Sequence, residues 1–264
     1  MPEIASSIIT LTTDFGYKDP FIAEMKGVIL SINPQATIID LTHDIEPFNV
    51  VQASFVVGSA YKYFPEGTIH IAVIDPDVGS ERRPIIIASS GHLFVGPDNG
   101  VFSRVLNAGN AARYVEITSE RYFLRKDSPT FQGRDIFAPV TAWLSKGINI
   151  SDIGSEIAGV KTINIPIVQR TKAGLVGVVL YIDQFGNAIT NITKNDLEHF
   201  GGNYRVHIKG QELTPFVYYA QSPAGGLGSL VNSSGYLEIF SYRGNASTLF
   251  DIGIGDTILV SGKK

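Results

Sequence analysis

Strand-like and helix-like segments alternate along the first part of this chain of 264 residues. Runs rich in β-branched residues alternate with segments whose apolar residues recur every three or four positions, the spacings typical of strands and helices. The expected strands are residues 8–12, 37–41, 68–74 and 85–88, and helices are expected to begin at Asp19-Pro20, with Asp19 as N-cap, and at Val50. This order needs crossover helices, so we predict an α/β/α sandwich with a mainly parallel sheet.

The pattern changes near residue 163. Beyond it, short alternating segments with frequent Gly and Asn replace the strand–helix units, at residues 175–182, 204–208, 236–240 and 257–260. One short helix is expected at residues 193–200, where Thr193 and Asp196 have the spacing of a capping box. We therefore predict an α/β domain at residues 1–163, a linker at 164–171 and a smaller, mostly antiparallel all-β domain at 172–264.

Composition excludes several classes of protein. Hydrophobic residues make up 44% of the chain and charged residues 17%, which is typical of a globular protein. The net charge of -4 gives no reason to expect nucleic acid or an anionic membrane as a partner. The absence of cysteine excludes disulfides and thiol catalysis. With no signal-peptide pattern and no run near the ~20 apolar residues of a membrane helix, we expect a cytoplasmic protein.

The sequence lacks the common nucleotide and metal motifs. No glycine-rich phosphate cradle follows the first expected strand, and the five histidines are not spaced as zinc ligands, so we expect no metal. His43-Asp44 is a candidate for a site, although a single histidine is more often structural. The remaining candidates are acidic residues at expected strand ends and two arginines: Asp14, Asp75, Asp98, Arg82 and Arg134.

Asp75 is the most informative of these candidates. It follows the expected strand 68–74, and in open α/β sheets ligands bind at the carboxyl ends of strands. A short loop containing Gly79 would bring Arg82 back towards it, and an arginine, always protonated, would keep the carboxylate ionised and aimed. The alternative is that Asp75-Pro76 only begins a turn and Arg82 is solvated, since Asp and Pro are common turn residues.

Seven ordered motifs span almost the whole chain, at residues 12–16, 41–45, 75–79, 96–100, 130–135, 183–187 and 233–238. Together they resemble the S-adenosyl-L-methionine hydroxide adenosyltransferases, relatives of the fluorinase and chlorinase enzymes. The resemblance implies a homotrimer with sites between one subunit's N-terminal domain and its neighbour's C-terminal domain. It implies hydrolysis of S-adenosyl-L-methionine to adenosine and L-methionine by attack of water at C5′, with no cofactor beyond this substrate.

The resemblance also implies roles for individual residues. By motif position, Asp14 would hold the ribose hydroxyls, and Asp19 and Asp183 would contact the methionine part. Aromatic walls would be formed by Phe48, Phe185 and Tyr219. The adenine would be contacted by Asn187, Asn245 and Ala246, and the methionine carboxylate by Ser233 and Ser234.

One position departs from the family pattern. The hydroxide-using members resemble one another in an Asp-Arg-His set that handles the water; Asp75 and Arg82 match two members, but Gln132 stands where the histidine is expected. Glutamine orients water by hydrogen bonds but does not titrate. The halide-using relatives lack the Asp-Arg pair, and the fluorinase has a serine at the position of the substrate-lining Gly133, so we expect water as nucleophile. The alternatives are a non-catalytic binder of the same ligand and a chlorinase-like, halide-using enzyme.

Overall fold

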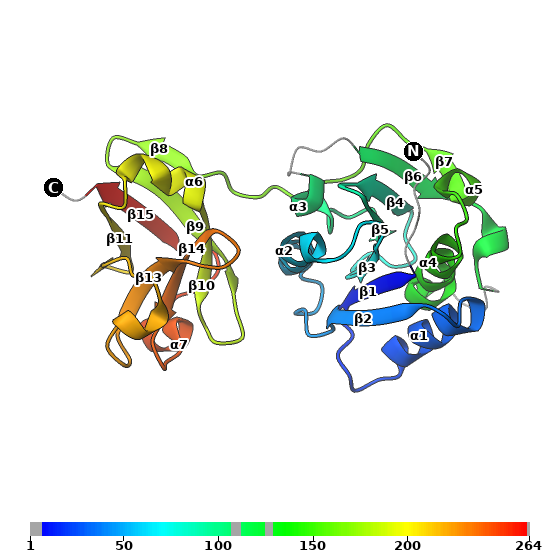
Figure 1. Cartoon of the computed structure of the whole chain (residues 1–264), viewed down its shortest axis with the longest axis horizontal. Coiled ribbons are helices and arrows are strands. Elements are labelled where there is room, and N and C mark those ends of the chain that lie inside the picture. Colours follow the sequence, from blue (N-terminus) through cyan, green and yellow to red (C-terminus); the bar gives the residue numbers. More distant parts are fainter. Residues whose placement is uncertain (1–6, 107–111, 125–128, 263–264) are drawn as a thin grey trace. The chain divides into compact units, whose positions relative to one another are not determined.

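The computed structural model describes residues 7–106, 112–124 and 129–262. The chain divides into two compact units, Met1–Ile163 and Asn164–Lys264, each with its own sheet (Figure 1). An α/β unit is therefore followed by a β-rich unit, as the sequence predicted. Among the described residues, no helix combines the length and apolar character needed to cross a membrane.

The sheet of the N-terminal unit is mixed rather than mainly parallel, which corrects the expectation from the sequence. Its strands are β1 (Ile8–Thr13), β2 (Thr37–Thr42), β3 (Ile69–Val73), β4 (Pro84–Ser89), β5 (His92–Pro97), β6 (Ala112–Ile117) and β7 (Gly154–Glu156), in the order β2-β1-β3-β5-β4-β6-β7. The β2-β1-β3-β5 part is parallel. The pairs β4–β5, β4–β6 and β6–β7 are antiparallel.

The connections of β4 explain this mixture. A parallel crossover takes a dozen or more residues, and the loop from β3 to β4 is too short for one. The turn from β4 to β5 contains only Ser90 and Gly91, with φ of 53° and 77°. Two successive positive φ values are the signature of a tight two-residue hairpin, which joins antiparallel strands.

Helices cover both faces of this sheet (Figure 1). They are α1 (Phe21–Ile32), α2 (Val50–Ala60), η1 (Tyr61–Tyr63), α3 (Ser103–Leu106), η2 (Glu120–Tyr122), η3 (Gly133–Phe137), α4 (Ala138–Ser145) and α5 (Ile150–Ile153). Successive strand residues enter different cores: Ile71 belongs to the core that includes residues of α1, α4 and α5, whereas Ala72 belongs to the core that includes residues of α2 and α3. This alternation, which follows from the two-residue period of a strand, produces the three-layer arrangement.

One local expectation was wrong. Helix α1 begins at Phe21 with Pro20 as N-cap and no side-chain cap, so Asp19, which is exposed, is not the cap. Residues Gly133–Phe137 form a π-helical turn that leads directly into α4. Such turns are rare and occur frequently at functional sites.

The C-terminal unit consists of antiparallel strands. They are β8 (Gln169–Thr171), β9 (Gly174–Ile182), β10 (Ala188–Thr193), β11 (Tyr204–Ile208), β12 (Gln211–Leu213), β13 (Leu227–Val231), β14 (Tyr236–Ser241) and β15 (Thr257–Gly262), and β12-β11-β15-β9-β10-β14-β13 is the strand order. Strand β8 pairs with β9, so residues 169–171 belong to this sheet although we expected them in the linker. The short helical segments are α6 (Lys194–Leu197), η4 (Glu198–Phe200), η5 (Tyr219–Gln221) and α7 (Ala246–Phe250). Thr193 and Asp196 form the predicted capping box.

Candidate active site

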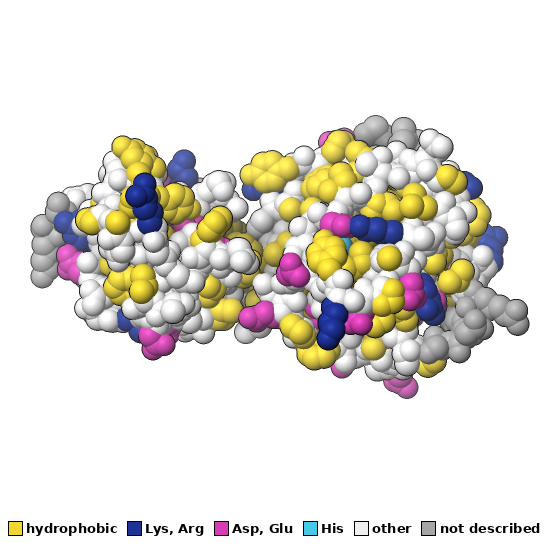
Figure 2. Space-filling view, turned by 90° about the horizontal axis from the view of Figure 1, so that it is seen from below, with side chains coloured by type: hydrophobic (Ala, Val, Ile, Leu, Met, Phe, Trp, Pro, Cys, Tyr) yellow, Lys and Arg dark blue, Asp and Glu magenta, His cyan; other side chains and the backbone are white. Residues whose placement is uncertain are grey.

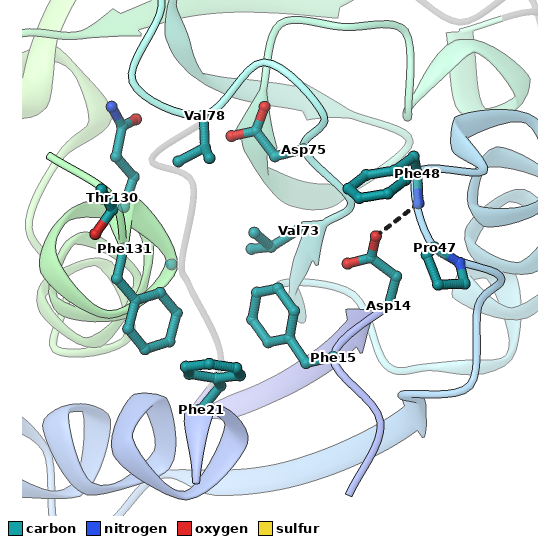
Figure 3. A pocket seen from close by; sticks show the side chains of 12 residues that line it. Asp14, Phe15, Phe21, Pro47, Phe48, Val73, Asp75, Val78, Thr130 and Phe131 are labelled. Carbon is teal, nitrogen blue, oxygen red and sulfur yellow. Dashed lines mark hydrogen bonds between the residues drawn. The ribbon is translucent and has the colours of Figure 1, made fainter. Parts of the chain in front are cut away.

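A cavity of about 450 Å³ opens at the carboxyl ends of β1 and β3. Its lining consists of Asp14, Phe15, Phe21, Pro47, Phe48, Val73, Asp75, Val78, Thr130, Phe131, Gln132 and Gly133. In Figure 3 the carboxyl groups of Asp14 and Asp75 face this cavity, and the rings of Phe15, Phe21 and Phe131 gather at its other end. Two carboxylates against a mostly apolar wall suit a ligand with hydroxyl or cationic groups on a hydrophobic body.

Asp14 directly follows β1. Its Oδ2 accepts a hydrogen bond of 2.9 Å from the backbone N–H of Phe48, drawn as the dashed line in Figure 3. Burial raises the pKa of Asp14; the bond from Phe48 opposes this shift, and the negative charge of Asp75 adds to it. Phe48 has φ of 68° and a side chain left 67% exposed. The bond to Asp14 therefore ties down a backbone conformation that non-glycine residues rarely adopt.

His43 supports the loop that carries Asp14. Its Nδ1 lies 2.8 Å from Thr13 Oγ1, and Thr13 Oγ1 also accepts from the backbone N–H of Phe15. The carbonyl of His43 accepts from Gly16 N–H at 2.9 Å, and its Nε2 lies 3.1 Å from Asp40 Oδ1. His43 is 1% exposed. The histidine noted in the sequence thus has a structural role beneath the loop.

Asp75 and Arg82 form a buried ion pair. Arg82 Nε donates to Asp75 Oδ1 at 3.0 Å and to Oδ2 at 2.9 Å, and Arg82 Nη2 also donates to Oδ2. Only 5% of the Asp75 side chain and 2% of the Arg82 side chain are exposed. The guanidinium lies over the ring of Phe137, 5.5 Å from its centroid. Arg82 is thus paired rather than solvated, and it fixes the orientation of a carboxylate that faces the cavity.

Gln132 and Gly133 also line the cavity. Gln132 Oε1 is buried, and no described residue donates a hydrogen bond to it. Gly133 is buried, and a Cβ at this position would lie 2.9 Å from the ring of Phe131 and 3.2 Å from Met25 Sδ. A larger residue at Gly133 would therefore displace the Phe131 ring.

Three phenylalanine rings form one wall of the cavity, and this cluster was not predicted from the sequence. The rings of Phe15, Phe21 and Phe131 meet edge to face, with centroids 5.3–5.8 Å apart. Such arrangements are favourable for aromatic side chains and fix the shape of the wall. Phe131 belongs to one of the quoted motifs, but nothing local indicated that it would meet residues near the other end of the unit.

Three other candidates from the sequence do not line the cavity. Asp19 is exposed on the surface before α1. Asp98 accepts from Arg83 Nε and from the backbone N–H of Lys161, at 3.0 and 2.6 Å, and so anchors the last part of the unit. Arg134 pairs with Glu24 and Asp135 at 2.9 and 2.7 Å. Asp98 and Arg134 are thus engaged in structural contacts.

The remaining predicted residues lie in the C-terminal unit, several of them in the turn between β9 and β10. Asp183 organises this turn: its Oδ1 accepts from the backbone N–H groups of Phe185 and Asn187 at 2.9 and 2.8 Å, and its Oδ2 accepts from Asn187 Nδ2 at 3.0 Å. Asn187 is buried, whereas Phe185 is 75% exposed. The turn thus exposes the Phe185 ring at the surface, while the hydrogen bonds to Asp183 fix the conformation of the turn.

Asn245 and Ala246 lie beside the same turn. Asn245 caps α7 by accepting from Thr248 N–H at 2.8 Å, and the N–H of Ser247 donates to the carbonyl of Gly186 at 3.0 Å. A Cβ on Gly186, whose φ is 80°, would collide with Asn245, so the close approach requires glycine there. Ala246 is fully buried. The structure therefore brings together two segments that lie about sixty residues apart in the sequence.

Tyr219, Ser233 and Ser234 occupy two further loops of this unit. Tyr219 lies in η5, and its hydroxyl donates to Glu238 Oε1 at 2.9 Å. Ser233, which is exposed, and Ser234 lie in the turn between β13 and β14. Burial and the charge of Glu238 raise the pKa of Tyr219, and the charge of Asp183 adds to this shift. The charge of Asp183 thus acts on the pKa of both Tyr219 and Glu238.

Comparison with known proteins matches both units of this chain to one family. The profile of the SAM hydroxide adenosyltransferase N-terminal domain matches residues 9–154, and that of the C-terminal domain matches residues 177–259. The (R)-S-adenosyl-L-methionine hydrolase of Methanocaldococcus jannaschii is 39% identical over 95% of this chain and 94% of its own. A fluorinase of Actinoplanes sp. is 25% identical over 99% of both chains. An uncharacterized conserved protein from Thermotoga maritima has a TM-score of 0.89 and 34% identity, covering 96% of this chain and 99% of its own.

Proposed function

This chain belongs to the S-adenosyl-L-methionine hydroxide adenosyltransferase family, and we propose on that premise that it hydrolyses S-adenosyl-L-methionine to adenosine and L-methionine. Water attacks C5′ of the ribose, the C5′–S bond breaks with its electrons leaving on sulfur, and the water gives up one proton. The observation that carries the proposal is the Asp75–Arg82 pair, whose carboxylate lines the same cavity as Asp14.

The nucleophile, rather than the leaving group, presents the chemical difficulty. Methionine departs as a neutral thioether, so no general acid is needed. Bulk water has a pKa of about 15.7 and is a weak nucleophile. Alignment of one water in line with the C5′–S bond therefore carries much of the expected acceleration.

Asp75 is the residue that we propose aligns this water. Arg82 donates to both of its oxygens and prevents the carboxylate from rotating. An ionised, fixed carboxylate accepts a hydrogen from the water and directs the oxygen lone pair away from itself. As the transition state develops, the same carboxylate accepts the proton, an effect typically worth about 10²- to 10⁴-fold.

Gln132 is the second acceptor in this proposal. Its buried Oε1 receives no hydrogen bond from any described residue, and it lines the cavity with Asp75. A water that donates one hydrogen to Asp75 and the other to Gln132 has a lone pair free for attack. Gln132 therefore holds the water, while Asp75 is the only one of the two that takes its proton.

Substrate binding is assigned partly from the contacts of Asp14 and otherwise from the resemblance to the family. The Asp14 carboxylate keeps one oxygen for the ribose hydroxyls, because its other oxygen accepts from Phe48. The aromatic residues Phe48, Phe185 and Tyr219 provide apolar surface for the adenosyl group. Asn187, Asn245 and Ala246 are proposed to contact adenine, Asp19 and Asp183 the methionine part, and Ser233 and Ser234 its carboxylate. We also propose that no metal is needed, since the leaving group is neutral; a chelator should leave the rate unchanged.

We further propose a homotrimer, in which the site is completed by the N-terminal unit of one subunit and the C-terminal unit of its neighbour. Exposed aromatic rings beside the candidate residues of each unit support this, since Phe48 is 67% and Phe185 75% exposed. Figure 2 shows hydrophobic side chains gathered on one face of the N-terminal unit. Exposed apolar patches of this kind commonly mark contacts with ligands or other chains. Light scattering that gave a monomeric mass for ligand-binding protein would contradict the trimer.

One assay tests the proposed activity. The protein is incubated with S-adenosyl-L-methionine, with and without chloride, and the products are separated by chromatography. Adenosine and methionine in equal amounts, independent of chloride, are expected. Formation of 5′-chloro-5′-deoxyadenosine would identify a halide-using enzyme, and retention of intact ligand without turnover would identify a binding protein.

A further inference from the structure

Glu238 is a buried carboxylate in the middle of the C-terminal unit. It lies on β14 and is 3% exposed. Its Oε1 accepts from the hydroxyl of Tyr219 at 2.9 Å, and its Oε2 accepts from Asn232 Nδ2 at 3.1 Å. Burial of a carboxylate is costly unless both oxygens are hydrogen-bonded, and here each oxygen has one donor. Neither hydrogen bond is part of the strand pairing, so the pairing of β14 does not explain why Tyr219 and Asn232 both donate to Glu238.

Through Asn232, Glu238 fixes the turn between β13 and β14. The Oδ1 of Asn232 accepts from the backbone N–H groups of Ser234 and Tyr236, at 3.0 and 3.1 Å. Because Glu238 accepts from Nδ2, the side-chain amide of Asn232 has only one orientation that satisfies both ends. The turn that carries Ser233 and Ser234 is therefore tied to the carboxylate of Glu238.

Through Tyr219, Glu238 fixes an aromatic surface. The Tyr219 ring meets the buried ring of Phe240 edge to face, with centroids 4.9 Å apart, while its hydroxyl is held by Glu238. The ring is thus restrained at both ends, although Tyr219 as a whole is 43% exposed. One carboxylate consequently sets the positions of two separate loops.

The electrostatics place Asp183 in the same neighbourhood. Burial raises the pKa of Glu238, the bonds from Tyr219 and Asn232 oppose this shift, and the charge of Asp183 raises the pKa further. The NH₂ group of Asn232 can only donate, so Oε2 of Glu238 acts as an acceptor, and the ionised carboxylate lets Oε1 accept from the Tyr219 hydroxyl as well.

We propose that Glu238 is a positioning residue for the substrate: it aligns Tyr219, assigned to the adenosyl group, with the Ser233–Ser234 turn, assigned to the methionine carboxylate, so that both meet one ligand. This inference rests on the proposed function, because Tyr219 and the two serines are assigned to the substrate there. Glu238 itself touches no ligand and acts through Tyr219 and Asn232. Since neither Tyr219 nor the two serines are assigned to the attacking water, the alignment supports binding of substrate and transition state alike.

The test is Glu238→Gln, which keeps the side-chain volume but replaces one acceptor oxygen by an NH₂ group. The remaining oxygen can still accept from Asn232, but the NH₂ group then meets the Tyr219 hydroxyl, which must turn to accept, so the bond from Tyr219 to a charged group is lost. KM for S-adenosyl-L-methionine should rise about tenfold, as expected for the loss of one hydrogen bond to a charged group, while kcat stays within about threefold. The matched control is Glu212→Gln, the same change at a side chain that is 61% exposed and pairs with Arg205; its kinetics should equal those of the parent.

Tyr219→Phe completes a double-mutant cycle. It removes only the hydroxyl that Glu238 holds, so it should raise KM as well, and the double variant should be no worse than about the worse single variant. Additive effects, or a Glu238→Gln variant that is less stable but keeps the parent KM, would overturn the positioning role. If Glu238→Gln does not fold, the comparison of Tyr219→Phe with Asn232→Ala decides, because each releases one loop.

A second readout separates this inference from the proposed activity. The Tyr219 resonance, assigned with Tyr219→Phe in protein carrying ring-labelled tyrosine, should shift in Glu238→Gln whether or not the protein is an enzyme. A parent that forms no adenosine would refute the proposed function. An unchanged Tyr219 resonance would refute the positioning contact alone.

Discussion

Arg82 donates from Nε to both carboxylate oxygens of Asp75, at 3.0 and 2.9 Å, in a pair that is almost completely buried. Removing one partner of a buried pair leaves an uncompensated charge, which typically costs about 3–5 kcal/mol. If the pair served only the stability of the fold, apolar residues could replace it. A carboxylate that faces a cavity and is held from behind by arginine is instead arranged to present its free lone pairs to a ligand.

Asp75→Asn keeps the shape of the side chain but removes its charge and its ability to take a proton. Turnover should fall by about 10²- to 10⁴-fold, while the affinity for S-adenosyl-L-methionine, measured by calorimetry, changes little. Arg82→Lys should behave similarly, because an ammonium cannot bind both carboxylate oxygens as a guanidinium does. Asp152→Asn, on the exposed side of α5, is the control for the amide change. Parent-like turnover in both site variants would remove Asp75 from the chemistry.

Gln132→His restores the third member of the expected family set. If glutamine limits the reaction, activity should rise and should increase with pH through the histidine pKa, about 6.5 before any local shift, because only neutral imidazole accepts a proton. The pH–rate profile of kcat is the measurement, and Gln132→Asn, which cannot titrate, is the control. A fall in activity would show instead that Gln132 is an integral part of this protein's own water site.

Asp14→Ala should weaken ligand binding. Each hydrogen bond to the charged carboxylate is worth about 1.5–3 kcal/mol, so the Kd should rise by at least about tenfold. Because burial raises the pKa of Asp14, the parent should also lose affinity as the pH falls through that raised pKa, where protonation removes an acceptor. Asp14→Asn should bind weakly without that pH dependence. Equal affinity of parent and Asp14→Ala would mean that Asp14 serves only the turn.

His70 should make folding sensitive to acid. It is fully buried, with Nδ1 2.7 Å from Thr10 Oγ1 and Nε2 3.3 Å from His92 Nδ1, and burial with the nearby His92 lowers its pKa to about 3. Between that value and the unfolded-state value near 6.5, the unfolded chain binds a proton that the folded chain does not. The contribution of neutral His70 to the free energy of unfolding is therefore fully present above about pH 6.5. Below that pH the free energy of unfolding should fall by up to about 1.4 kcal/mol per pH unit.

Urea denaturation at several pH values measures this slope. His70→Gln should have a shallower slope than the parent, whereas His199→Gln, at an exposed position, should retain the parent slope. Equal slopes in all three proteins would show that His70 does not control acid stability.

The sequence predicted much of the fold because periodicity and turn residues are local signals. It indicated β1, α1, β2, α2 and β3, and the capping box of Thr193 and Asp196. It did not indicate that β4 and β5 pair in antiparallel directions, because periodicity reveals a strand but not the direction in which the strand runs in the sheet. Ser90-Gly91 was the available signal, since a Ser-Gly dipeptide between two apolar runs is typical of a hairpin.

Contacts between distant segments account for what the sequence could not predict at the site. The length of the loop indicated that Arg82 could reach Asp75, and the structure contains that pair. No local pattern could indicate that Phe131 meets Phe15 and Phe21, or that Glu238 joins Tyr219 to Asn232. Such contacts depend on the completed packing of each unit, which a single sequence does not encode in any one window.

Hydrolysis in water enriched in heavy oxygen tests the central claim most directly. If water attacks C5′ and the C5′–S bond breaks, mass spectrometry should find the heavy oxygen in the 5′-hydroxyl of adenosine and none in methionine, at one atom per turnover. Adenosine without label, or a halogenated nucleoside as the main product, would contradict attack by water. Labelled adenosine that is formed as rapidly by Asp75→Asn would keep the reaction but contradict the role of the Asp75–Arg82 pair.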